Sequence, residues 1–276
     1  SRIDEFYTQY QNLGVLERVK QSYKAYYGID GDLASGPKLG IKRDGKKGEI
    51  SKIKVNDLKN LLNHILVLAT NPRPAYEARA TNSDFKSLTQ ARLGNSILEY
   101  YLQEKDLEHV LKKAAEDSLT CGQSWVSLSW NPNLGEEFGV HPETNAVIRE
   151  GDVNYSNHND LDVIRDIYTE NDYQWVILRK TVNKYDLSDR YPEKKDQIYS
   201  QEFSKDRQRH IVPREYSSES DYIEIYHFYH KPTECVKEGR YSVILSDGEV
   251  LFDGPIPYRE LPVYKLAPSV ISGTSF

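Results

Sequence analysis

The chain has 276 residues, of which 38% are hydrophobic, and a formal net charge of −6 at pH 7. This length and apolar content are enough for one large domain or two small ones with a real core. The acidic balance argues against a surface built to grip phosphates, because nucleic-acid-binding domains usually carry a net basic charge or a concentrated basic stripe. No stretch approaches the roughly 20 apolar residues that a membrane-spanning helix needs.

Cysteine and methionine usage adds two expectations. Cys121 and Cys235 are far apart and form no CxxC motif, which is typical of a protein from a reducing compartment. The sequence contains no methionine, opens on Ser1, and stops at Phe276 directly after a segment marked by proline and glycine. We therefore expect a piece of a longer polypeptide.

The first 50 residues predict a helix followed by a surface loop. Apolar and aromatic residues recur at helical spacing from Ile3 to Tyr26, and the helix is expected to end at Gly28. Residues 28–48 are rich in Gly, Lys and Asp, but their glycines lack phosphate-binding spacing. A basic run overlaps the loop and favours a solvated face, with contact to nucleic acid or an acidic partner as the alternative. Its members are Lys38, Lys42, Arg43, Lys46, Lys47, Lys52 and Lys54.

A second helix is predicted over residues 55–68. Its apolar side chains share one side, so we expect it to be well buried. These side chains are Leu58, Leu61, Leu62, Ile65 and Leu66. Asn71-Pro72-Arg73-Pro74 ends the helix, because proline cannot continue the hydrogen-bond ladder.

Residues 83–130 form the stretch around which we expect the rest of the chain to be organised. Apolar residues recur at three- and four-residue steps from Phe85 to Leu119, and the pattern slips near Asp106. This predicts two stacked helices or one long bent helix, ending at Gly122. The period then changes to two, with Val126, Leu128 and Trp130 alternating with serines, which predicts a half-buried strand.

The C-terminal half reads as short strands and turns. We predict strands at residues 174–180 and 222–229, a short helix at 183–190 and a charged excursion or mobile loop at 193–220. Asp247-Gly248 between two β-rich runs predicts a hairpin with a type I′ turn. The Pro-rich segment at 254–263 predicts an edge strand or a domain exit.

No pattern in the sequence predicts an enzyme. His227 and His230 fall on opposite faces of a strand, and Cys121 at a helix end is typical of packing. The polar run 157–162 resembles a calcium loop but lacks the central glycine and distal glutamate of an EF-hand. No cofactor or metal site is predicted.

Tyrosine is abundant, with 21 residues against 7 phenylalanines. A tyrosine ring with a polar tip suits a subunit interface, where one end is dry and the other wet, although ordinary surface aromatics explain part of the set. The tyrosines that we predict at a subunit interface are Tyr100, Tyr101, Tyr222, Tyr226 and Tyr229.

The order of these features resembles the N-terminal half of the portal proteins (head-to-tail connectors) of tailed bacteriophages, particularly the short-tailed, podovirus-like type. The resemblance runs from about Asn71 onward and depends on the order and spacing of several segments. They are Asn71-Pro72-Arg73-Pro74, LTQARLGNSILEYYLQEKDLEHVLKKAAEDSLTCGQSWVSLSW, Gly151-Asp152-Val153, QWVILRKTVNKYDLSDRYP, YIEIYHFYHKP and LPVYKLAPSVISGTSF.

The resemblance implies an α+β fold: a mixed α/β portal wing domain with long helices packed on short antiparallel strands. It places N-terminal helices and the basic loop in residues 1–70 and the wing domain in residues 71–276. The stem and clip of a portal are expected after residue 276.

The resemblance also implies a structural protein without enzymatic activity. Portals form a ring, usually a dodecamer, at the unique capsid vertex of the virion, assembled in the host cytoplasm. Viral DNA passes through the channel without sequence-specific contacts during packaging and ejection. The implied partners are the major capsid protein, the terminase large subunit and tail adaptor proteins.

Two alternatives remain open at this point. The first is another phage head-tail adaptor or minor capsid protein that also forms rings. The second is a metal-dependent nuclease, in which Asp160 and Asp162 would hold the metal.

Overall fold

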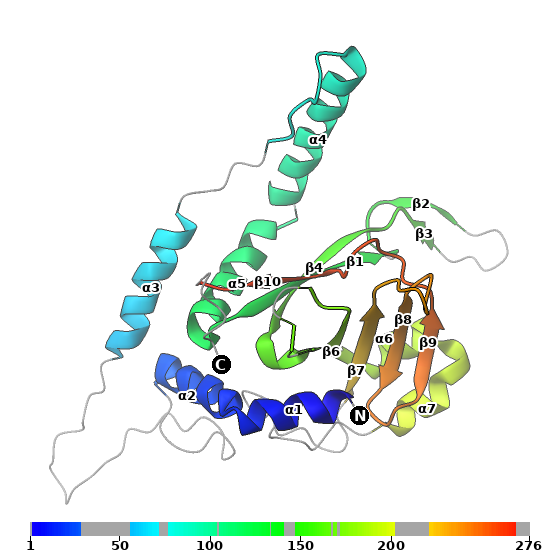
Figure 1. Ribbon diagram of the computed structural model, residues 1–276. Coiled ribbons are helices and arrows are strands. Elements are labelled where there is room, and N and C mark those ends of the chain that lie inside the picture. The colour runs from blue at the N-terminus through cyan, green and yellow to red at the C-terminus, as the bar shows by residue number, and fades with distance from the viewer. Residues whose placement is uncertain are drawn as a thin grey trace, which may run out of the picture.

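The structure is a computed structural model, and it describes most of the chain. The described residues are 2–28, 56–71, 77–103, 105–132, 134–140, 147–166, 168–169, 172–201 and 221–268. The basic run of residues 38–54, the Pro72-Arg73-Pro74 segment and residues 202–220 of the predicted excursion lie outside them. The described part consists of helices and antiparallel sheets, which confirms the predicted α+β class (Figure 1).

Two helices replace the single helix predicted at the N-terminus. They are α1 (Arg2–Asn12) and α2 (Val15–Tyr27). Gly14 separates them with a φ of 68°, a left-handed conformation that glycine adopts without a Cβ penalty. Gly28 ends α2 in the same conformation, as predicted.

Helix α3 (Asp57–Thr70) has about the predicted length but not the predicted burial. It begins at Asn56, whose side chain accepts a hydrogen bond from the Lys59 amide. Only Leu66 is buried, whereas Leu61 is 58% exposed and Leu68 is 73% exposed. The prediction of a well-buried helix is wrong, because α3 packs on α2 and α5 along one narrow side only.

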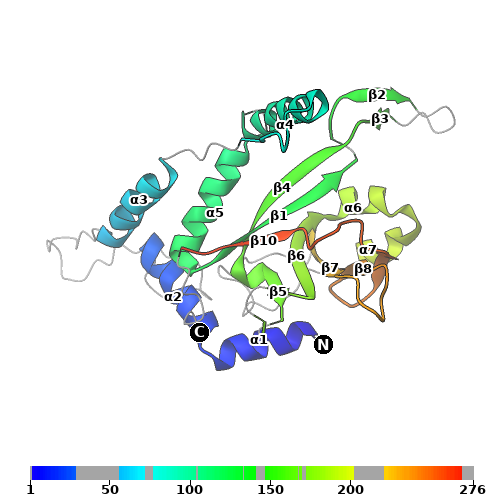
Figure 2. The same cartoon turned by 45° about the horizontal axis from the view of Figure 1, so that its top comes forward.

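The long central stretch forms two helices, α4 (Phe85–Gln103) and α5 (Leu107–Cys121), as the slip in its pattern predicted. Asp106 separates them with a φ of 52°. Helix α5 packs on the sheet, but α4 buries none of its residues and projects away from the body (Figures 1 and 2). The expectation that the whole stretch forms the packed centre is therefore wrong for α4, whose apolar residues are spread around the helix.

A three-stranded antiparallel sheet has the order β10-β1-β4. Its strands are β1 (Ser124–Asn131), β4 (Asp152–Asn159) and β10 (Val263–Leu266). The first half of β1 is buried on both faces, because α5 lies on one side and the second sheet on the other. The prediction of a half-buried strand is wrong there, and Trp130, predicted to point inward, is 55% exposed. Strand β10 lies at an edge, and it begins only at the last residue of the Pro-rich segment 254–263, whose residues 255–262 form no strand.

A five-stranded antiparallel sheet has the order β5-β6-β7-β8-β9. Its strands are β5 (Val163–Arg165), β6 (Trp175–Asn183), β7 (Tyr222–His230), β8 (Arg240–Leu245) and β9 (Val250–Gly254). The predicted hairpin joins β8 to β9, with Gly248 at a φ of 97°. Asp247 does not have a positive φ, so the turn is not the predicted type I′.

Each face of the five-stranded sheet is covered. Ile177 and Tyr226 pack against α1 and α2 on one face, and alternate residues such as Leu178 and Tyr229 face the three-stranded sheet on the other. At the far end of that second face lie α6 (Lys184–Arg190), which begins at the predicted Asn183, and α7 (Lys195–Ser200). Helices α1 and α2 share a core with β5 to β7. The division of the chain into domains 1–70 and 71–276 stays a prediction.

A separate hairpin completes the described structure. It consists of β2 (Glu137–Val140) and β3 (Val147–Arg149), which pair only with each other within the described residues. The hairpin extends from the end of β1 and β4 opposite α5 (Figure 1).

Gly122 allows a test of how backbone conformation ends α5. Its φ of 92° lies in the left-handed region, and a Cβ there would meet no atom within 4 Å. We expect Gly122→Ala to lower the free energy of unfolding by about 1–2 kcal/mol through backbone conformation alone, measured by urea denaturation. Gly139→Ala is the matched control, because Gly139 has an ordinary φ and equally open surroundings. Equal effects of the two changes would contradict this account.

Candidate assembly surface

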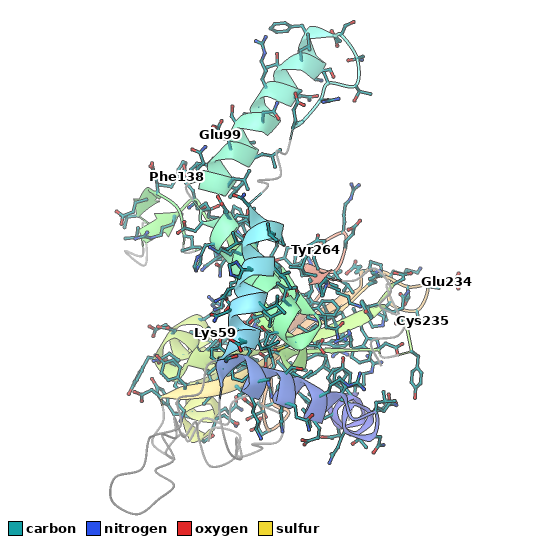
Figure 3. The ribbon with its side chains drawn as sticks, turned by 90° about the vertical axis from the view of Figure 1, so that its left-hand side faces the viewer. Lys59, Glu99, Phe138, Glu234, Cys235 and Tyr264 are labelled. Atoms are coloured by element: carbon teal, nitrogen blue, oxygen red, sulfur yellow. The ribbon has the colours of Figure 1, made fainter. Side chains whose placement is uncertain are left out.

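Exposed apolar side chains concentrate on the two helices that project from the body. On α4, Phe85 is 82% exposed and Leu93 is 60% exposed, and no residue of this helix is buried. Figure 3 views the molecule with α3 in front and α4 rising above the body. Apolar residues exposed along a helix in this way mark a surface for contact with other protein. The surfaces of α3 and α4 are therefore the candidate assembly surface.

The tyrosines predicted at an interface occupy different positions. Tyr100 on α4 is 47% exposed, and Tyr222 at the start of β7 is 48% exposed. Tyr101 lies at the base of α4, where its hydroxyl donates to Asp152 Oδ1 at 3.2 Å. Tyr226 and Tyr229 are only 6% and 3% exposed, because β7 is a central strand and its two faces are covered by the same chain. These two rings contribute to the protomer's core and offer a neighbour almost no surface.

Sequence reasoning missed the exposed residues of the β2–β3 hairpin. Phe138 is 79% exposed and Val140 is 58% exposed. Phe138 is labelled in Figure 3. The signal was an apolar residue beside a glycine in a turn-rich region, which does not distinguish a surface hairpin from a core strand. The exposure of α3 was missed because helical periodicity indicates an apolar side but not what covers it.

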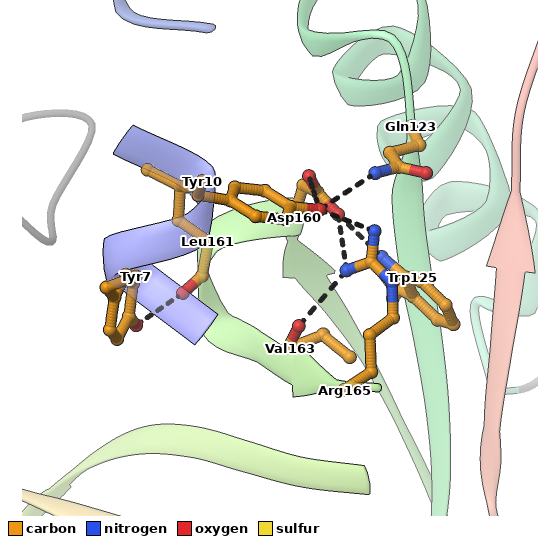
Figure 4. Close-up of polar contacts among 8 residues, drawn as sticks. All are labelled: Tyr7, Tyr10, Gln123, Trp125, Asp160, Leu161, Val163 and Arg165. Atoms are coloured by element: carbon orange, nitrogen blue, oxygen red, sulfur yellow. Dashed lines mark hydrogen bonds and ion pairs between the residues drawn. The ribbon is translucent and has the colours of Figure 1, made fainter. Parts of the chain in front are cut away.

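Asp160 lies at the centre of a buried polar network and is 1% exposed (Figure 4). Its Oδ1 accepts from Arg165 Nη1 at 3.0 Å and from Trp125 Nε1 at 3.1 Å, and its Oδ2 accepts from the Tyr10 hydroxyl at 3.1 Å. Arg165 Nη2 also donates to the Tyr10 hydroxyl at 2.6 Å. The network joins α1, β1 and β5, so this carboxylate stabilises the packing of three elements.

The charges in this network set the ionisation of its members. Burial alone would lower the pKa of Arg165, but the attraction of Asp160 and the nearby hydroxyls outweighs burial and raises that pKa. Burial, followed by the charge of Asp160, raises the pKa of Tyr10. Arg165 therefore stays charged and Tyr10 stays neutral in the folded protein.

Asp162 does not join Asp160 in a metal site. Its Oδ1 accepts from Arg179 Nη2 at 2.6 Å and from Arg179 Nε at 3.0 Å, so each of the two carboxylates has its own arginine. Among the described residues, no group of three His, Cys, Asp or Glu side chains is placed to hold a metal ion. The geometry gives the nuclease alternative no support.

His158, His227 and Cys121 are packed into the protomer. His158 Nε2 lies 2.7 Å from Ser127 Oγ, and His227 Nδ1 lies 3.0 Å from the Tyr241 hydroxyl. Burial, followed by the charge of Lys180, lowers the pKa of each of these histidines to about 3. Burial raises the pKa of Cys121 to about 12, so its thiol is a poor nucleophile at neutral pH.

Breaking the Asp160 network tests its structural role. Asp160→Asn leaves the Arg165 charge buried without its partner, and we expect a loss of about 3–5 kcal/mol in the free energy of unfolding. Arg149→Met is the control, because the Arg149–Glu137 pair is exposed and should contribute less than about 1 kcal/mol. The double variant Asp160→Asn/Arg165→Met should lose less than the sum of its single changes. Additive losses, or equal losses for Asp160→Asn and Arg149→Met in urea denaturation, would contradict the role.

The buried histidines predict a pH dependence of stability. Both fold as neutral groups with a pKa near 3, against an ordinary value of 6.5, so the unfolded state binds more protons as the pH falls below about 6.5. We expect each histidine to lower the free energy of unfolding by about 2 kcal/mol between pH 7 and pH 5. Urea denaturation at several pH values across this range gives the free energy of unfolding as a function of pH. This free energy should fall less between pH 7 and pH 5 for His158→Gln than for the unmodified protein, and still less for His158→Gln/His227→Gln. An unchanged pH dependence in both variants would refute the role of the buried neutral histidines.

Comparison with known protein families gives an identification. No helix within the described residues has the length and apolar character needed to cross a membrane. The curated proteins include no match to this chain. The family model of the phage P22-like portal protein matches residues 43–271, which confirms the resemblance found in the sequence and is compatible with the podovirus-like type. Because this match covers most of the sequence, the chain belongs to the phage P22-like portal protein family.

Proposed function

We propose that this chain is the wing part of a portal ring, in which identical copies surround an axis at the unique vertex of the capsid. The observation that carries the proposal is the match of residues 43–271 to the portal family. The ring is a dodecamer, and it works by symmetric assembly without a cofactor or bond chemistry. The protein is assembled in the host cytoplasm and stays in the virion.

The exposed helices support this assembly. Isolated apolar residues on a surface are ordinary, but a projecting helix with exposed apolar residues along its length marks a contact site. A ring requires heterologous contacts, in which one face of a subunit meets a different face of the next. We assign α4, with Tyr100 and Tyr101, to such a contact, together with Tyr222 at the start of β7. Tyr226 and Tyr229 support the interface from within the protomer by holding β7 in place.

The charge of the chain suits a conduit for DNA. With a formal net charge of −6, it has little overall attraction for phosphates, so DNA can slide past without being held. In the proposed function, double-stranded DNA passes through the channel during packaging and ejection. The terminase large subunit, tail adaptor proteins and the major capsid protein bind the ring at other surfaces.

Electron microscopy and native mass measurement of the full-length protein test the ring. We expect a closed ring with an open axial channel. A monomer at all concentrations, or metal-dependent cleavage of DNA that Asp160→Asn abolishes without unfolding the protein, would overturn the proposal.

A pair of exposed tyrosines tests the α4 contact. Tyr100 on α4 is 47% exposed and Tyr185 on α6 is 55% exposed, so replacing either with Glu adds a charge at a comparable site. We expect Tyr100→Glu to raise the subunit concentration needed for ring formation by about tenfold or more, because replacing an aromatic ring by a carboxylate at a contact costs over about 1.4 kcal/mol. Tyr185→Glu should change it by less than about twofold. Equal effects, measured by analytical ultracentrifugation, would place the contact elsewhere.

A further inference from the structure

One side of α3 forms a regular apolar seam that the protomer does not cover. Its members follow steps of three, four and three residues, the spacing of a helix that packs lengthwise against other protein. They are Leu58 (43% exposed), Leu61 (58%), Ile65 (39%) and Leu68 (73%). No Asp, Glu, Lys or Arg follows Lys59 within this helix. We call these four residues the α3 seam.

The β2–β3 hairpin is a second exposed apolar surface of about the same character. Its apolar side chains are Phe138 (79% exposed), Val140 (58%) and Val147 (51%), with Ile148 (42%) on the face opposite the Val140–Val147 pair. A two-stranded hairpin is marginally stable by itself in water, and this one joins neither of the other sheets within the described residues. Cover from another molecule would stabilise it.

The two surfaces cannot cover one another within one chain. In Figures 1 and 2, α3 lies on the left and the hairpin on the right, with α5 and the three-stranded sheet between them. This placement on opposite sides is what head-to-tail association of identical copies requires.

Their charges are complementary as well. Helices α2 and α3, which pack side by side, carry four basic residues against the two acidic residues Glu17 and Asp57. The four basic residues are Arg18, Lys20, Lys24 and Lys59. The hairpin and its flanks carry Glu136, Glu137 and Glu150 against Arg149 alone. Opposite net charges orient two surfaces as they approach and disfavour the contact of like with like.

We propose that the α3 seam of one subunit receives the β2–β3 hairpin of the next copy of this chain. The inference rests on the proposed ring and names the two faces that meet. The face of the hairpin that carries Val140 and Val147 covers the four seam residues, and the acidic flanks of the hairpin lie toward the basic side of α2 and α3. Each subunit gives its hairpin to one neighbour and receives the hairpin of the other, so every copy has both surfaces covered.

Thiol crosslinking between differently tagged copies tests this pairing. The full-length protein carries Cys121→Ser and Cys235→Ser, and then either Leu61→Cys or Phe138→Cys. We expect a short bifunctional thiol reagent to give a crosslinked dimer in the mixture at least about tenfold more than in either variant alone, since contact raises the effective thiol concentration to the millimolar range. Asn60→Cys mixed with Phe138→Cys is the control, because Asn60 is exposed on α3 but points away from the seam.

The outcomes separate this inference from the ring itself. Closed rings without a Leu61→Cys to Phe138→Cys crosslink would leave the ring in place and overturn the pairing. A crosslink between two Leu61→Cys copies would also overturn it, because that contact joins like surfaces. If the unmodified protein forms no ring at any concentration, the proposed function fails as well. As a second measurement, Leu61→Glu should prevent closed rings and Asn60→Glu should not, with both variants folded by circular dichroism; rings formed equally by both would refute the seam.

Discussion

The buried pair of Asp160 and Arg165 is the interaction on which the packing of the body depends. A charged pair with side chains 1% and 4% exposed is tolerated only when every lone pair and proton has a partner, and here Tyr10 and Trp125 provide partners. These residues come from α1, β1 and the strand after Asp160 (Figure 4). Helix α1 therefore has one position against the two sheets, although the first residues of the chain are some 150 positions from their partners.

A second polar cluster sets the direction of α4, which has almost no packing of its own. Asp152 at the start of β4 forms an ion pair with Lys105 and accepts from the Tyr101 hydroxyl. The hydrogen bond from Lys105 lowers the pKa of Asp152, so the carboxylate remains charged at neutral pH. The left-handed Asp106 lies directly beyond Lys105 and separates α4 from α5. The projecting helix is thus held at its base by polar contacts, and its apolar length stays open to other molecules.

The protein therefore combines a fully covered body with uncovered extensions. Both faces of the five-stranded sheet and the first half of β1 are closed by the chain itself, whereas α3, α4 and the β2–β3 hairpin expose their apolar residues. In the proposed ring, this contrast separates what folds the subunit from what joins subunits. Apolar residues that one copy exposes to water can be buried in a symmetric contact with another copy.

The sequence by itself determined the elements whose signals are local. The helix end at Gly122, the helix start at Asn183, the break near Asp106 and the hairpin around Gly248 each depend on the backbone preferences of a few neighbouring residues. The sequence also identified the α+β class and the portal family from the order of these elements. Tertiary structure alone decided burial, because the same helical periodicity describes a helix inside a core and one waiting for a partner. It buries Tyr226 and Tyr229, leaves α3 and α4 exposed, and pairs Asp160 and Asp162 with separate arginines. Each of these outcomes depends on which distant segments of the chain pack next to one another, and not on the spacing of residues within a segment.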